Sequence, residues 1–283
     1  MRGNAGPRLS RVHGATGQDR RHHVLTSEGM HAAQIVTACA AGLAGLPVGS
    51  YATVLAARVP DAQNVLRPAG RCPQCGSTLT AAEMIPLFSW LRQRGRCAAC
   101  GQPYGRRYLA TELVTAAVFA ALGFRVGPSA LLAPLCYLAA VGMALALIDI
   151  DRHRLPHVLT ITSYPVVVVL LVLAAAFTAH GWEHLAGSME GMAGLWLFYA
   201  VLAVTLPGQM GWGDVWLAGL LGLPLGWLGP RALIAGTLAT FLLAWPAAMR
   251  TIAARRRGRQ ASLIPLGPFM LVGALLAVLV AVT

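Results

Sequence analysis

The sequence predicts an all-α polytopic membrane protein with about eight transmembrane helices and a small cytoplasmic zinc-binding domain between the first two. Hydrophobic residues make up 57% of the 283 residues and charged residues 11%, a composition typical of chains that lie largely in lipid. The apolar residues fall into runs of about 20, the length that crosses a bilayer. Backbone groups in lipid have to be satisfied within the segment, so we expect each run to be helical.

Eight apolar runs are candidate spans, although the second and the sixth are short. They cover residues 32–55, 108–124, 129–148, 158–179, 189–206, 214–228, 231–249 and 264–282. The chain is therefore expected to divide into a first transmembrane helix over 30–55, a soluble segment over 56–107 and a transmembrane core over 108–283.

The distribution of arginine predicts the orientation of these spans. If the first span runs from outside to inside, 15 of the 22 arginines lie on the cytoplasmic side: Arg58, Arg67, Arg71, Arg92, Arg94, Arg96, Arg106, Arg107, Arg152, Arg154, Arg250, Arg255, Arg256, Arg257 and Arg259. Only Arg125 and Arg231 then lie in outer loops, which agrees with the positive-inside bias. The net charge of +12 does not indicate a nucleic-acid partner, because these arginines flank spans and form no patch interleaved with aromatic residues.

The first 29 residues do not fit this arrangement, since their five arginines would lie outside. They lack the apolar core of a signal peptide and are rich in Gly, Arg, Ser and His, a composition typical of disorder. We therefore expect residues 1–29 to be a disordered tail, or Met30 to be the true start of the protein.

The soluble segment contains two Cys-x-x-Cys pairs, in RCPQCGSTL and GRCAACGQPYGRR. Cys72 and Cys75 are separated from Cys97 and Cys100 by 21 residues. Four thiolates on tight turns favour tetrahedral zinc, and the glycine that follows each pair lets the backbone bend. Four protein ligands leave no open position, so the zinc is expected to be structural.

The alternative for these four cysteines is a pair of disulfides, which an oxidising compartment would favour. The arginine distribution places the segment in the reducing cytoplasm, so zinc is the favoured interpretation. Cys39 and Cys136 lie alone inside spans, where a lone cysteine is usually a small packing residue.

Acidic residues are scarce, and four of the ten lie at the expected cytoplasmic ends of spans: Glu112, Asp149, Asp151 and Asp214. A carboxylate at membrane depth is costly and is a functional candidate by default. Asp149 ends the third span and Asp214 begins the sixth at the same membrane face, so the two can meet. Glu112, beside Arg106 and Arg107, is expected to be an interfacial ion-pair partner.

A pair of carboxyl groups suits peptide hydrolysis. Two carboxyls that share a site repel each other, so one holds a proton while the other draws a proton from water, which can then attack a peptide carbonyl. Gly211 and Gly213 precede Asp214 and permit a close approach that a Cβ would block. For Asp149 or Asp151 the alternative is an interfacial residue paired with Arg152 or Arg154, and either aspartate can be the one that points inward.

These motifs together resemble the type IV prepilin peptidases, membrane aspartic proteases of the Gly-x-Gly-Asp type. LPVGSYATVLAARVP resembles the family's first-span exit, and the segment from RCPQCG to LATELVTA its cytoplasmic zinc domain. ALIDIDRHRLPH and GQMGWGD resemble the two catalytic segments, and IPLGPFM resembles a segment before the last span. The ordered motifs extend over most of the chain after Met30.

The resemblance implies that Asp149 and Asp214 are the catalytic residues, with Gly211, Gly213 and Asp151 in support. Such enzymes lie in the bacterial inner membrane and remove a basic leader from type IV prepilins or type II secretion pseudopilins at the cytoplasmic face. Many members then methylate the new N-terminus with S-adenosylmethionine. The chain departs from the family pattern at His157, where an Asp is frequent, and at Trp216, where a Lys is frequent.

A second class of function is a non-enzymatic membrane protein. In a transporter or an assembly scaffold the same acids would carry protons or ions, and the zinc module would be a docking surface. A transporter is expected to contain inverted repeats with broken helices in matching positions, and the sequence shows no persuasive repeat.

Overall fold

The computed structural model describes residues 17–63, 75–77, 96, 99–102, 106–205, 210–257 and 265–282. The regular elements of these residues are all helical. They are α1 (Gly17–Arg58), the short 3-10 helix η1 (Val59–Asp61), α3 (Arg106–Val126), α4 (Leu132–Arg152), α5 (His157–Ala176), α6 (Gly181–Thr205), α7 (Trp212–Trp227), α8 (Pro230–Arg256) and α9 (Gly267–Ala281). The prediction of an all-α fold is confirmed for this part of the chain.

Six of the helices in the described ranges are long and apolar enough to cross a membrane: α1, α3, α4, α5, α6 and α8. The other two are shorter, with 16 residues in α7 and 15 in α9. Each of the eight expected spans overlaps one of these helices. Helix α1 starts at Gly17, well before Met30, and the prediction about the true start of the protein stays a prediction.

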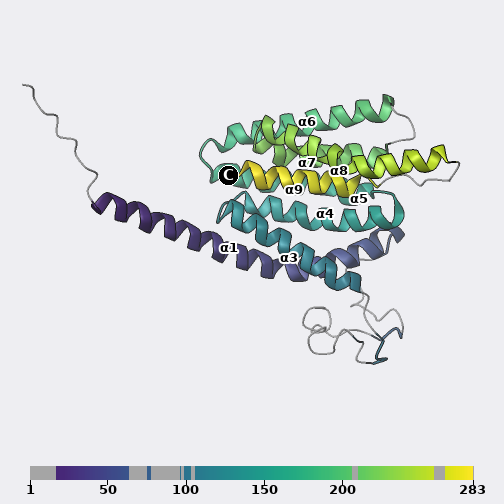
Figure 1. The fold of residues 1–283 in the computed structure, drawn as a ribbon, viewed down its shortest axis with the longest axis horizontal. Helices are drawn as coiled ribbons and strands as arrows, with labels where there is room; N and C mark the ends of the chain where they lie inside the picture. Colours follow the sequence, from purple (N-terminus) through teal and green to yellow (C-terminus); the bar gives the residue numbers. More distant parts are fainter. Residues whose placement is uncertain are drawn as a thin grey trace, which may run out of the picture.

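Helices α4 to α9 lie side by side in one bundle, and α1 crosses α3 at its edge (Figure 1). Consecutive helices are the main partners, because α1 packs on α3, α6 on α7 and α8 on α9. Helix α7 also contacts α5, α8 and α9, so it is the central helix of the bundle. All of its residues from Leu217 to Trp227 are buried, which means that a short helix can lie at the centre without facing lipid.

Glycines allow α6 and α7 to approach each other closely. Gly187 and Gly191 of α6 face Gly222 and Gly226 of α7, and each pair is spaced by four residues so that both members lie on one face. A Cβ added to Gly191 would lie 2.5 Å from the Gly222 carbonyl oxygen and 2.7 Å from the Gly226 Cα atom. These neighbours are backbone atoms, so they cannot be moved by a change of rotamer.

Replacing Gly191 by alanine is therefore expected to separate α6 from α7 and to lower the free energy of unfolding. The expected cost is about 1–3 kcal/mol, which is typical of an extra methyl group forced into a packed interior. Thermal unfolding of the detergent-purified protein measures the effect.

Gly194→Ala is the matched control, because Gly194 lies in the same helix and a Cβ there would meet nothing within 4 Å. Alanine is a better helix former than glycine, so this variant is expected to be as stable as the wild type or slightly more stable. Equal melting temperatures for the two variants would contradict the close contact.

Candidate active site

Asp149 lies in the last turn of α4, with 5% of its surface exposed. The helix ends because His153 adopts the left-handed conformation, with φ of 51°, and its N–H donates to the Asp149 carbonyl. The Asp149 carboxylate points into the protein, where its Oδ2 atom accepts a hydrogen bond of 3.0 Å from the Gly267 N–H at the start of α9.

Asp214 lies in the first turn of α7. The Gly211 N–H, at the residue that precedes this helix, donates to Asp214 Oδ2 over 3.3 Å. A carboxylate in this position is favourable, because the first N–H groups of a helix lack partners within the helix and carry partial positive charge.

The two glycines of the GWGD stretch have different surroundings. A Cβ added to Gly213 would lie 2.8 Å from the Leu155 Cβ atom, so its missing side chain lets the turn after α4 pack on α7. A Cβ added to Gly211 would meet no atom closer than Asp214 Oδ2, at 3.7 Å. The close approach in this stretch therefore depends on Gly213.

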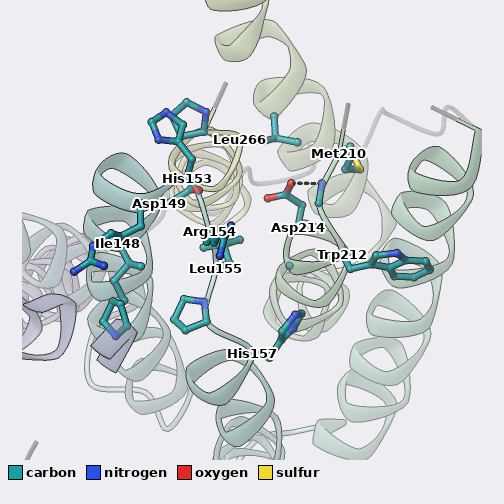
Figure 2. A pocket seen from close by; sticks show the side chains of 16 residues that line it. Ile148, Asp149, His153, Arg154, Leu155, His157, Met210, Trp212, Asp214 and Leu266 are labelled. Carbon is teal, nitrogen blue, oxygen red and sulfur yellow. Dashed lines mark hydrogen bonds between the residues drawn. The ribbon is translucent and has the colours of Figure 1, made fainter. Parts of the chain in front are cut away.

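Asp149 and Asp214 line the same cavity, which has a volume of about 810 Å³. Figure 2 shows the two side chains on different helices, and Leu155 and Leu266 line the same cavity. Gly211 and Gly213 also line the cavity, and Pro60 of η1 reaches it from the N-terminal part of the chain. The fold thus brings together two carboxylates that are 65 positions apart in the sequence (214 − 149).

Asp151 does not line this cavity. Its Oδ1 atom accepts a hydrogen bond of 2.8 Å from Arg107 Nη1, and the same guanidinium donates to the Leu147 carbonyl over 3.3 Å. The Asp151 side chain is 40% exposed. Of the two neighbouring aspartates, Asp149 is the one that faces the cavity, while Asp151 connects the end of α4 to the start of α3.

The rim of the cavity is basic. Arg152, His153, Arg154 and His157 all line it. Arg152 also pairs with Asp61 of η1, with Nη2 3.2 Å from Oδ2. His157 lies at a position where the family that the motifs resemble often has an acid. In this protein it belongs instead to a group of basic side chains.

Trp216 points away from this group. Its ring makes edge contacts with Tyr164 of α5 and Trp196 of α6, and the Tyr164 hydroxyl donates to the Trp216 carbonyl over 2.6 Å. Trp216, at a position where the family that the motifs resemble often has lysine, therefore packs against α5 and α6, two residues from Asp214.

Two of the four predicted zinc ligands, Cys72 and Cys97, lie outside the described residues. Cys75 and Cys100 are both exposed, and each is followed by a glycine in the left-handed conformation, with φ of 72° at Gly76 and 69° at Gly101. This backbone conformation favours glycine and forms the tight turn that a Cys-x-x-Cys metal knuckle needs. The two described turns therefore have the backbone conformation of such knuckles, and the zinc site itself stays a prediction.

Glu112, predicted to be an interfacial ion-pair partner, is more deeply buried than that prediction expects. Its side chain is fully buried, with 0% exposed, at the point where α3 meets α1. A Cβ added to Gly49 of α1 would lie only 2.8 Å from the Glu112 Cα atom, which shows how closely the two helices pack there. Arg107, one of its predicted partners, pairs with Asp151 instead.

Sequence reasoning did not identify Gly267 as a site residue. The stretch IPLGPFM was only matched to a family segment before the last span, and no residue of it was predicted to be a site residue, since a backbone N–H leaves no mark in a sequence. The available signal was a glycine at the first position of a helix, followed by a proline that has no N–H of its own.

Two family models match the chain. Residues 43–126 match the bacterial peptidase A24 N-terminal domain, and residues 136–249 match the type IV leader peptidase family. The second match includes both Asp149 and Asp214. No solved structure matches the chain.

Curated relatives named prepilin leader peptidase/N-methyltransferase match most of the chain. The Bacillus subtilis protein is 34% identical over 236 residues, which are 83% of this chain and 91% of that protein. The Klebsiella pneumoniae protein is 35% identical, over 73% of this chain and 90% of that protein. The Myxococcus xanthus protein is 37% identical over 67% of this chain, but the match spans only 56% of its own length.

The two family models together cover the chain from the middle of α1 to α3 and from α4 to α8, which includes both aspartates. The family that the sequence motifs resemble is therefore confirmed: this multi-pass bacterial membrane protein belongs to the type IV leader peptidase family.

Proposed function

We propose that this protein is a membrane aspartic endopeptidase that removes the basic leader from type IV prepilins or type II secretion pseudopilins. One observation carries the proposal: Asp149 and Asp214, from two helices within the matched family region, line a single cavity. The names of the relatives supply the substrate class, since they are prepilin leader peptidases. The transporter and scaffold alternatives have no comparable support.

The two carboxyl groups act together on one water molecule. The ionised carboxylate takes a proton from the water, whose oxygen attacks the carbonyl carbon of the scissile peptide. The protonated carboxyl group donates its proton as the tetrahedral centre collapses, the C–N bond breaks and the amine leaves. One water is consumed, and the products are the leader with a new carboxyl end and the pilin with a new amino end.

The cavity suits the proposed substrate in size and lining. A volume of about 810 Å³ lies within the range of about 300–1,000 Å³ that is usual for binding pockets. Met210, Leu155 and Leu266 give its wall an apolar part beside the two carboxylates. The apolar helix of a prepilin can reach this wall from the bilayer while its polar leader stays in water.

The zinc domain and the orientation of the chain belong to the same proposal. All eight helices cross the bacterial inner membrane, and the segment 56–107 faces the cytoplasm. Cys72, Cys75, Cys97 and Cys100 hold one structural zinc, which stabilises the fold of this segment and takes no part in peptide hydrolysis. The left-handed turns at Gly76 and Gly101 support this ligand set.

The names of the relatives also include N-methyltransferase activity. We propose that this protein shares it and transfers a methyl group from S-adenosylmethionine to the amine that cleavage releases. S-adenosylhomocysteine is the second product. This part of the proposal rests on those names.

The peptidase proposal predicts that Asp149→Asn and Asp214→Asn each reduce cleavage of a prepilin by about 10²- to 10⁴-fold, because a positioned acid or base contributes that much. The measurement is the rate of leader removal by detergent-purified protein, followed by electrophoresis and mass spectrometry.

Asp151→Asn is the matched control. It removes an exposed ion pair with Arg107, which is worth at most about 1 kcal/mol, and is expected to retain cleavage within a few-fold of the wild type. Full activity of either Asp149→Asn or Asp214→Asn, or loss of activity in Asp151→Asn alone, would contradict the assignment of the pair.

The zinc proposal predicts about one zinc ion per purified chain, because four thiolates complete one tetrahedral site. Cys75→Ser and Cys100→Ser are expected to lose the metal, as measured by inductively coupled plasma mass spectrometry. Cys136→Ser, which changes a partly buried cysteine of α4, is expected to keep it. A metal-free wild type with two disulfides among the four cysteines would refute the proposal.

A further inference from the structure

The Asp149 carboxylate accepts a hydrogen bond from a backbone group and not from a side chain. Gly267 donates its backbone N–H to Asp149 Oδ2 over 3.0 Å, in a buried hydrogen bond between residues 118 positions apart. A Cβ added to Gly267 would lie 2.8 Å from the same Oδ2 atom, 3.4 Å from Asp149 Cγ and 3.5 Å from Leu155 Cδ2. The carboxylate therefore occupies the space that a side chain at position 267 would fill.

We propose that Gly267 is a positioning residue for peptide hydrolysis: its N–H fixes the orientation of the Asp149 carboxylate, and its missing side chain leaves room for that orientation. The inference rests on the proposed peptidase function and names a residue that acts on the reaction through Asp149. It assigns no contact with the substrate to Gly267.

The requirement at position 267 is one of space and not of backbone conformation. Gly267 is not among the glycines with positive φ, which in the described residues are Gly76, Gly101, Gly127 and Gly229. A larger residue can adopt the backbone conformation found at 267, so an alanine there tests only the contact with Asp149. The N–H itself remains in such a variant, but the carboxylate has to move away from it.

The N–H of Gly267 is available because of its place in α9. The first N–H groups of a helix have no partner within that helix, and Pro268, which follows, has no N–H at all. Leu266 accepts from the Met270 N–H over 3.1 Å, which closes the first turn and fixes the direction of the Gly267 amide. The position of α9 therefore determines where the Asp149 carboxylate is held.

This bond determines which oxygen is left for chemistry. Oδ2 accepts from Gly267, which orients the carboxylate and leaves Oδ1 as the oxygen that does not share this donor. Asp214 is held in a similar way, since its own Oδ2 accepts from Gly211 at the start of α7. A displacement of about 1 Å at a reacting group can cost on the order of a hundredfold in rate, so a methyl group at 267 acts on the rate and not on binding.

The test compares Gly267→Ala with Gly142→Ala. Gly142 lies in α4 two turns before Asp149, and its added Cβ would meet Leu271 Cδ2 of α9 at 2.7 Å. Both variants therefore add one methyl group between the same two helices. In Gly142→Ala the methyl group meets the flexible end of a leucine, and in Gly267→Ala it meets the carboxylate.

With a purified prepilin as substrate, Gly267→Ala is expected to lower kcat by on the order of tenfold to a hundredfold while KM changes by less than about threefold. Its pH–rate profile is expected to differ from that of the wild type, because the surroundings of one carboxylate of the pair have changed. Gly142→Ala is expected to retain the kcat and the pH–rate profile of the wild type. Wild-type kcat in Gly267→Ala, or equal losses in both variants with unchanged pH–rate profiles, would overturn the inference.

A second measurement is independent of activity. The amide resonance of Gly267, assigned in a ¹⁵N-glycine spectrum by its loss in Gly267→Ala, is expected to shift in Asp149→Ala and to stay in place in Asp151→Ala. An unshifted resonance in Asp149→Ala would overturn the inference even if the protein cleaves prepilin. A wild type that leaves prepilin intact would instead refute the peptidase proposal, while the resonance still shows whether Gly267 holds Asp149.

Discussion

Two carboxylates can line one cavity of an apolar bundle because each of them accepts a hydrogen bond from a backbone N–H at the start of a helix. An ionisable group that is removed from water needs hydrogen-bond partners, and the first N–H groups of a helix are donors without partners in their own helix. Asp214 uses the start of its own helix, α7, and Asp149 uses the start of a different helix, α9. The arrangement places both acids in the wall of one cavity.

The rest of the fold keeps these two helix starts in place. Facing glycines allow α6 to pack closely on α7, which buries α7 at the centre of the bundle. Gly213 allows the turn after α4 to contact the first turn of α7, and Leu155 from that turn lies against both Gly213 and Gly267. Two exposed ion pairs, Arg107 with Asp151 and Arg152 with Asp61, attach the same end of α4 to the N-terminal part of the chain.

Much of this could be predicted from the sequence. Long apolar runs indicate helices whatever their partners, and all eight expected spans coincide with helices. The choice between Asp149 and Asp151 could not be made, because residues two positions apart on a helix point in nearly opposite directions and only the neighbouring helices decide which one is enclosed. Gly267 was missed because its contribution is a backbone N–H. The burial of Glu112 could not be predicted because it depends on the close approach of α1 at Gly49, which is a property of two helices together.

Asp149 and Asp214 face one cavity, and Asp151 does not. This arrangement can be tested without substrate by placing cysteines at 149 and 214 in a protein that lacks Cys39 and Cys136, and treating it with a short bifunctional thiol reagent. Mass spectrometry of the digested protein identifies the linked peptides. A link is expected between positions 149 and 214, and none is expected between 151 and 214 in the corresponding variant. Efficient linking of 151 to 214 without linking of 149 to 214 would contradict it.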